Sequence, residues 1–200
     1  MAGEELIRFN DVACMRGGRL LFEGLCLSVC AGEALVLTGP NGIGKSSLIR
    51  IAAGLLPPAA GKVFRPQSAA LLGHDLALDE AMPLAAALRF WARLDGVEEA
   101  AVERAMQAFA LTQLAPAPVR YLSSGQRRRA GLARVVASGA RLWLLDEPGV
   151  GLDDASLALL AAAMADHRAA GGAVLAATHM DLGLEAPRLL DLGRLSGQNR

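Results

Sequence analysis

Residues 39–46 and 122–126 form two short motifs whose residue types are suited to binding phosphate groups. The first reads Gly-Pro-Asn-Gly-Ile-Gly-Lys-Ser and has the spacing G-x-x-x-x-G-K-[ST]. Glycines let backbone N–H groups turn towards phosphate oxygens, and a helix that starts at such a loop adds the positive end of its dipole. The second reads Leu-Ser-Ser-Gly-Gln, with two hydroxyl groups and an unshielded N–H at the start of another predicted helix. The first motif by itself predicts a protein that binds a nucleoside triphosphate.

The segments around the first motif favour the structure that this motif requires. Residues 33–38 are mostly apolar and are typical of a buried strand, whereas residues 47–53 are typical of a helix that Gly54 ends. Strand, glycine loop and helix in this order predict that Lys45 reaches the β- and γ-phosphates and that Ser46 is a ligand of Mg²⁺. The predicted nucleotide-binding residues of the loop are Gly39, Pro40, Asn41, Gly42, Ile43, Gly44, Lys45, Ser46 and Ser47.

Residues 142–147 provide the acidic groups that hydrolysis of a triphosphate would need. Four apolar residues are followed by Asp146 and Glu147, as expected of a buried strand that ends at the ligand-binding edge of an α/β sheet. Asp146 suits the Mg²⁺ site, through a water molecule, and Glu147 suits a general base for the attacking water. The alternative, a strand that merely ends in solvated acids, is weak beside a phosphate loop.

On these motifs the chain, over roughly residues 4–195, resembles the ATP-binding cassette (ABC) ATPase subunits. Residues 122–126 match the family signature L-S-x-G-Q. The resemblance implies a homodimer of head-to-tail subunits, in which the signature of one chain meets the γ-phosphate of the ATP bound by the second copy. The signature residues are Ser123, Ser124, Gly125 and Gln126. A phosphate-loop kinase is disfavoured, because the signature would then have no purpose.

The resemblance also implies roles for four residues outside these motifs. His179 follows the predicted strand 173–178 and matches a histidine that contacts the γ-phosphate, and Asp153 matches a loop that bridges the subunits. His74 occupies the position of a glutamine that links the nucleotide site to the membrane partner. Arg16 occupies the position of an aromatic residue that stacks on adenine, and a planar guanidinium can also stack on a base. The last two depart from the family pattern, but neither change removes a phosphate or Mg²⁺ contact.

Four further segments resemble one subfamily, the haem exporter ATP-binding subunits of bacterial c-type cytochrome maturation. They are residues 16–22, 32–42, 73–74 and 87–90. This resemblance implies ATP and Mg²⁺ as cofactors, multi-span membrane subunits as partners, and a peripheral position on the cytoplasmic face of the bacterial inner membrane. No direct haem ligand is predicted. Two alternatives stay open: a soluble ABC ATPase that drives assembly, as in iron–sulfur assembly, and an ABC ATPase subunit for another substrate.

The composition argues against several other classes of protein. The net charge is zero at pH 7, so no nucleic-acid partner is expected, and the basic run 127–129 is interpreted as a solvated or interface face. No uncharged apolar run reaches the length of a membrane span, and residues 1–10 carry acids rather than the apolar stretch of a signal peptide. Cys14, Cys26 and Cys30 are an odd number without a metal-binding spacing and are expected to be reduced packing residues, the last two on an edge strand.

The whole chain, residues 1–200, is predicted to be a single α/β domain of the phosphate-loop NTPase (ABC ATPase) type. Residues 1–73 and 140–200 should form the nucleotide-binding core, with a mainly parallel sheet and an antiparallel β subdomain whose hairpin turns at Gly17 and Gly18. Residues 74–139 should form a helical subdomain that carries the signature. The helices expected in it are 84–94, 98–109 and 126–138.

Overall fold

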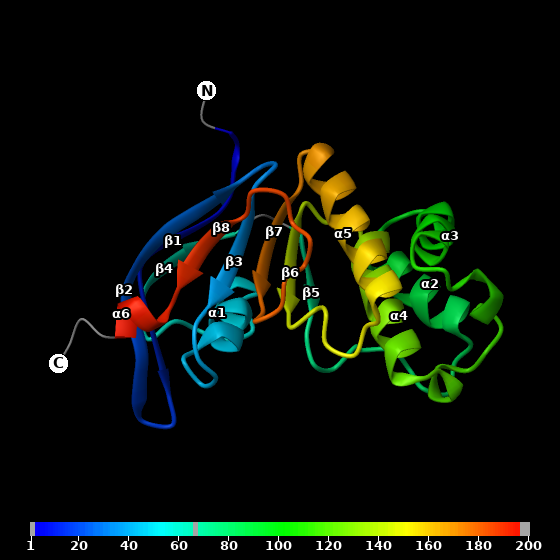
Figure 1. Cartoon of the computed structure of the whole chain (residues 1–200), viewed down its shortest axis with the longest axis horizontal. Helices are drawn as coiled ribbons and strands as arrows, with labels where there is room; N and C mark the ends of the chain where they lie inside the picture. The colour runs from blue at the N-terminus through cyan, green and yellow to red at the C-terminus, as the bar shows by residue number, and fades with distance from the viewer. Residues whose placement is uncertain (1–2, 66–67, 197–200) are drawn as a thin grey trace.

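The computed structural model describes residues 3–65 and 68–196, which form two β-sheets and a group of helices (Figure 1). The larger sheet has five strands, and all of its neighbouring pairs are parallel. This arrangement confirms the predicted parallel core sheet. In spatial order its strands are β5 (Ala69–Leu72), β6 (Leu142–Asp146), β7 (Ala173–Ala177), β3 (Ala34–Thr38) and β8 (Arg188–Asp191).

Alternate residues of the interior strand β6 pack into two different layers of the core. Leu142 and Leu144 join the cluster that includes α1 (Lys45–Ala52), whereas Trp143 and Leu145 join the cluster that includes α5 (Asp154–Ala169). Successive side chains of a strand point to opposite faces, so α1 and α5 cover opposite faces of the sheet. This double coverage explains why β6 reads as a continuous apolar run.

The smaller sheet is antiparallel and packs against the phosphate-loop side of the molecule. Its order is β2 (Arg19–Cys30), β1 (Glu5–Arg16) and β4 (Ala60–Phe64). The hairpin between β1 and β2 turns at Gly17 and Gly18, whose φ angles are 55° and 75°. A two-residue turn with both φ values positive matches the twist of a hairpin, and the predicted turn is confirmed.

The three cysteines are free thiols. Cys14 is buried in β1, and burial raises the pKa of its thiol, which keeps it protonated and unreactive. Cys26 is exposed on β2, which is an edge strand as predicted, and its Sγ accepts a hydrogen bond from the Asp11 N–H at 3.2 Å.

The remaining helices gather at the end of the molecule away from the antiparallel sheet (Figure 1). They are α2 (Leu84–Leu94), α3 (Glu99–Ala108), α4 (Ser124–Ala137) and two 3-10 turns (Thr112–Leu114 and Val119–Tyr121); a short helix, α6 (Gly193–Ser196), follows β8. Among the residues that the structure describes, no helix combines the length and apolar character that crossing a bilayer requires.

Helix α4 begins two residues earlier than the sequence predicts. Ser123 is its N-cap: the Ser123 hydroxyl accepts a hydrogen bond from the Gln126 N–H at 3.2 Å, and the Gln126 side-chain oxygen accepts one from the Ser123 N–H at 2.8 Å. This reciprocal capping box satisfies two N–H groups that would otherwise lack partners. It places the signature within the first turn of α4.

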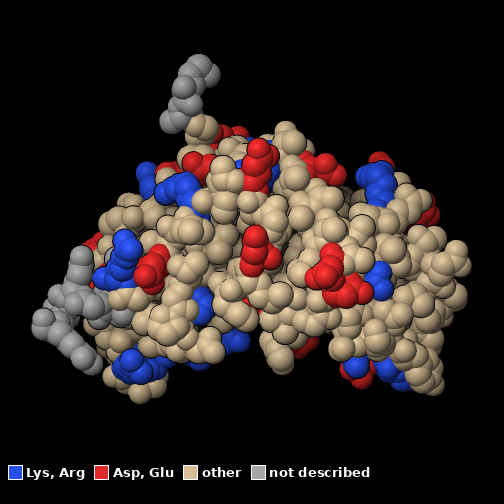
Figure 2. All heavy atoms as spheres, viewed as in Figure 1, with Lys and Arg blue, Asp and Glu red and all other residues tan. Residues whose placement is uncertain are grey.

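Charged side chains of both signs are interspersed on the face of the molecule shown in Figure 2. Lys and Arg residues do not gather into one large patch on this face, and the whole chain has twenty basic and twenty acidic residues. A broad nucleic-acid footprint would need a basic stripe or patch.

Candidate functional site

The loop between β3 and α1 has the backbone geometry of a phosphate-binding loop. Gly39 and Gly44 have φ angles of 123° and 116°, a conformation that residues with a Cβ rarely adopt. Gly44 is the N-cap of α1 and makes no side-chain cap. The first N–H groups of α1 therefore keep their hydrogen-bonding capacity for an anion.

Lys45 is 7% exposed and lies against the same loop. Its Nζ donates hydrogen bonds to the carbonyl oxygens of Gly39 at 2.7 Å and Pro40 at 3.3 Å. These bonds hold the ammonium group over the loop, where it could turn from carbonyl to phosphate oxygens. The structure thus places a mobile positive charge where the motif requires it.

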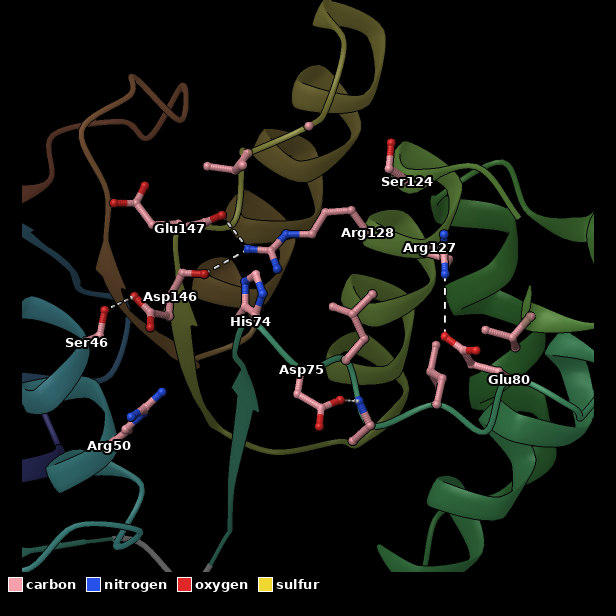
Figure 3. Close-up of a pocket in the computed structure, with 16 residues that line it drawn as sticks. Ser46, Arg50, His74, Asp75, Glu80, Ser124, Arg127, Arg128, Asp146 and Glu147 are labelled. Atoms are coloured by element: carbon pink, nitrogen blue, oxygen red, sulfur yellow. Dashed lines mark hydrogen bonds and ion pairs between the residues drawn. The ribbon is translucent and has the colours of Figure 1, made fainter. Parts of the chain in front are cut away.

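Ser46 and Asp146 meet at the end of β6 (Figure 3). The Ser46 hydroxyl donates a hydrogen bond to Asp146 Oδ1 at 2.9 Å. A hydroxyl and a carboxylate oxygen are hard donors of the kind that Mg²⁺ prefers when it also binds phosphate. Within residues 3–65 and 68–196 no group of three or more His, Cys, Asp or Glu side chains is placed to hold a metal. A hydroxyl and a carboxylate at this distance fit the protein ligands of a Mg²⁺ ion that also binds phosphate oxygens.

Glu147 and His179 are brought together from the ends of two neighbouring strands. His179 Nδ1 lies 3.1 Å from Glu147 Oε2, and both side chains are partly exposed. Glu147 has a φ of 48°, which is uncommon for a residue other than glycine, and its N–H donates to the Ala177 carbonyl at 2.8 Å. Such a conformation costs on the order of 1 kcal/mol and persists only where its surroundings enforce it.

A cavity of about 870 Å³ brings together several of the residues that the sequence singles out (Figure 3). Ser46, His74, Ser124, Asp146 and Glu147 all line it, although they come from four separate parts of the chain. A second cavity of about 330 Å³ is lined by the phosphate loop and the segment after β7. Its lining includes Gly39 and His179.

Some signature residues form hydrogen bonds within the chain, and others leave their polar groups available. The side chains of Ser123 and Gln126 are occupied by the capping box, whereas Ser124 is exposed and lines the larger cavity. A Cβ added at Gly125 would lie 3.1 Å from the Gly151 carbonyl oxygen. The Gln126 N–H is used by the capping box, so the Ser124 hydroxyl and the N–H groups of Ser124 and Gly125 are the ones that remain available to a second molecule.

Arg16 and Asp153 are among the predicted site residues that line neither cavity. Arg16 is exposed at the end of β1, beside the hairpin turn. Asp153 is the N-cap of α5, and its Oδ1 accepts a hydrogen bond from the Ser156 N–H at 2.9 Å. Hydrogen bonds from Ser156 are the main cause of the lowered pKa of the Asp153 carboxyl. Both residues reach solvent.

Arginines 127–129, interpreted from the sequence as a solvated or interface face, are only partly exposed in the structure. All three are half-buried and have partners within the chain. Arg127 forms an ion pair with Glu80, and Arg129 Nη1 donates to the Phe109 carbonyl at 2.8 Å. Arg128 bonds to backbone carbonyls at the edge of the larger cavity. The composition of the chain could not predict these contacts, because the burial of the three arginines depends on which residues α4 packs against.

A glycine phosphate loop after a central parallel strand, with a Ser–Asp oxygen pair and a further carboxylate beyond it, defines a phosphate-loop nucleoside triphosphatase. The family model "ABC transporter" matches residues 22–150, which is more than half of the chain. The chain therefore belongs to the ABC transporter family, and it is an ABC-type ATPase.

Two curated relatives match nearly the whole chain. The chain is 57% identical to the cytochrome c biogenesis ATP-binding export protein CcmA of Sphingopyxis alaskensis, over 90% of this chain and 92% of that protein. It is 54% identical to the protein of the same name from Novosphingobium aromaticivorans, with the same two coverages. Among solved structures, an ATP-binding subunit of an ABC transporter has a TM-score of 0.80 and 26% identity, and the match covers 88% of this chain and 80% of that one. These likenesses confirm the predicted family and fold.

Proposed function

We propose that this chain is the ATP-hydrolysing subunit of a transporter complex for haem export in c-type cytochrome biogenesis. The observation that supports this most is the identity of more than half of the residues to two proteins named for cytochrome c biogenesis, over nine-tenths of the chain. The complete set of nucleotide-site motifs supports the hydrolytic part of the proposal.

In the proposed mechanism the loop from Gly39 to Ser47 binds the phosphates of ATP, and Lys45 contacts the β- and γ-phosphates. Ser46 and Asp146 would hold Mg²⁺, which neutralises charge on the phosphate oxygens. The Glu147 carboxylate accepts a proton from the water that attacks the γ-phosphorus, and the bond to ADP breaks. His179, whose Nδ1 lies 3.1 Å from that carboxylate, orients it and contacts the γ-phosphate.

The proposal includes a homodimer, because the first turn of α4 offers free groups with no ligand in its own chain. Ser123, Ser124, Gly125 and Gln126 would meet the ATP of the second copy, and Asp153 would bridge the two chains. The exposed Arg16 would stack on adenine. Residues 74–139 would move as a helical unit against the core formed by residues 1–73 and 140–200. The dimer would be peripheral, held at the cytoplasmic face of the inner membrane by multi-span subunits.

The overall proposal can be tested by complementation, with the two lysines of the chain as a matched pair. In a bacterium that lacks its own copy of the gene, the wild-type chain should restore covalently bound haem in c-type cytochromes. Lys45→Ala should fail, because losing a charged hydrogen-bond donor should weaken ATP binding by about 10-fold or more. Lys62→Ala, at an exposed position of β4, should succeed. Haem staining of the separated cytochromes measures both results, and normal cytochromes in the deletion strain would refute the proposal.

His74 is proposed to couple the nucleotide site to the membrane subunit. It is exposed and lines the larger cavity, while Met82 and Phe90, 36% and 50% exposed, offer apolar surface nearby in the sequence. Trp91 is less suited to this, because its Nε1 donates to the Ala77 carbonyl at 2.6 Å within the chain.

His74→Gln should alter the partner-stimulated ATPase activity by several-fold and change the basal activity much less. The reason is that the proposed phosphate, Mg²⁺ and water contacts belong to other residues, whereas His74 lines the cavity beside them. ATPase assays of the same preparation with and without the membrane subunit measure the difference. Equal effects on both activities would count against the coupling role.

A further inference from the structure

The guanidinium of Arg128 makes hydrogen bonds to backbone carbonyls of two segments that are distant in the sequence. Figure 3 shows the bonds to one of them, at Asp146 and Glu147. Nη1 donates to the Gly73 carbonyl at 3.0 Å, Nη2 donates to that of Asp146 at 2.8 Å and also to that of Glu147, and Nε donates to that of Pro148 at 3.2 Å. One side chain on α4 therefore holds the end of β5 and three consecutive residues at the end of β6.

These contacts depend on the shape of an arginine as well as on its charge. A guanidinium presents its N–H groups in a fixed plane and in several directions, whereas a lysine ammonium is a single point. Burial is the main influence on the Arg128 guanidinium and lowers its pKa, and the charges of Asp146 and Glu147 partly offset this. The carbonyls of those two residues accept the hydrogen bonds, so their carboxylates stay free for other partners.

Glu147 is the residue that most needs this support. Its φ of 48° would be disfavoured in a free chain. Its N–H is fixed by the Ala177 carbonyl at 2.8 Å, and its own carbonyl is fixed by Arg128. With both backbone groups held, the side chain projects towards His179, 3.1 Å away.

The first turn of α4, which lies one helical turn before Arg128, packs on the segment that follows β6. The ideal Cβ position of Gly125 lies 3.1 Å from the Gly151 oxygen, and Ser124 lines the same cavity as Glu147. Helix α4 thus touches the segment after β6 at two points, Gly125 and Arg128. A displacement of α4 would move both contacts and hence the backbone of Glu147.

We propose that Arg128 is a positioning residue that directs Glu147 and transmits movements of α4 to it. This inference rests on the proposed function, in which Glu147 acts at the ATP of its own chain and Ser124 meets the ATP of the second copy. Binding at one site would then align the base of the other. Arg128 would thereby make the two ATP sites of a dimer hydrolyse cooperatively.

The test compares Arg128→Gln with Arg129→Gln in the full chain, with any co-purifying partner retained. Arg129 is the next residue of α4, and its Nη1 donates to the Phe109 carbonyl instead of to the carbonyls of Asp146, Glu147 or Pro148. Turnover is divided by the number of sites that bind a fluorescent ATP analogue, so that unfolded protein is not counted. Arg128→Gln should lower kcat by about 10²-fold, the scale of a misplaced catalytic group, with little change in KM. Its Hill coefficient for ATP should fall to about 1, and Arg129→Gln should retain both values.

Several outcomes would overturn the proposal. Two of them concern turnover: a near-normal turnover per site in Arg128→Gln, or a loss of turnover in Arg129→Gln as large as that in Arg128→Gln. Two others are a complete loss of ATP-analogue binding in Arg128→Gln and a Hill coefficient of 1 for the wild-type protein. Full rescue by Arg128→Lys would also overturn it, because charge without the planar fork would then suffice. Glu147→Gln, assayed in parallel, separates the two hypotheses. Normal turnover in Glu147→Gln would refute the role of Glu147 as the general base. Lost turnover in Glu147→Gln together with normal turnover in Arg128→Gln would refute only the positioning role of Arg128.

Discussion

Glu147→Gln should lower ATP turnover by about 10²-fold or more, which is the scale of losing a general base, while ATP binding is retained. The amide has nearly the shape of the carboxylate, so the backbone bonds to Ala177 and Arg128 should persist. The phosphate and Mg²⁺ contacts belong to Lys45, Ser46 and other residues. The variant should therefore accumulate as an ATP-bound dimer, which size-exclusion chromatography with and without ATP can detect.

Glu103→Gln is a matched control, because Glu103 is exposed on α3 and far along the chain from the site residues. Its turnover and its elution should both equal those of the wild type. If Glu147→Gln hydrolyses ATP at close to the wild-type rate, another group must act on the water. Loss of ATP binding in that variant would instead show that Glu147 has a structural role.

Mixing two inactive variants should restore ATPase activity if each ATP site is shared between chains. Lys45→Ala damages the phosphate loop, and Ser124→Glu puts a negative charge where the signature would face the partner's nucleotide. The homodimer of either variant alone is symmetric, so both of its ATP sites are damaged. A mixed dimer collects both defects at one site and leaves the other intact, so it should regain up to about half of the wild-type activity.

Ser124 is better suited to this experiment than Gly125, the next residue of the signature. A side chain at Gly125 would meet the Gly151 oxygen within the same chain, which would confuse a local clash with a defect between chains. Ser124 is exposed, and an acid in the first turn of a helix is compatible with the helix dipole. Ser124→Ala serves as the control and should remain active. Absence of rescue in dimers shown by differential tags to be mixed would argue that each chain is self-sufficient.

The local chemistry of this protein was determined by the sequence. The spacing of Gly44, Lys45 and Ser46 defines a loop that closes on itself through short-range bonds, and Gly17 and Gly18 specify the hairpin turn without help from distant residues. The apolar runs of β6 and β7 predict buried parallel strands, because both faces of such strands are covered. The start of α4 differs from the prediction: Ser123 caps α4 with its own side chain, so α4 starts at Ser124 rather than at residue 126.

The tertiary structure decided which of these residues meet. Ser46 and Asp146 are one hundred positions apart and lie within a hydrogen bond, because β3 and β6 end at the same edge of one sheet. The arginine run 127–129 shows that composition does not predict what each arginine contacts. Successive residues of a helix point about 100° apart, so Arg127, Arg128 and Arg129 face different surroundings. Only the packing of α4 against the end of β6 places Arg128 among the carbonyls that hold Glu147.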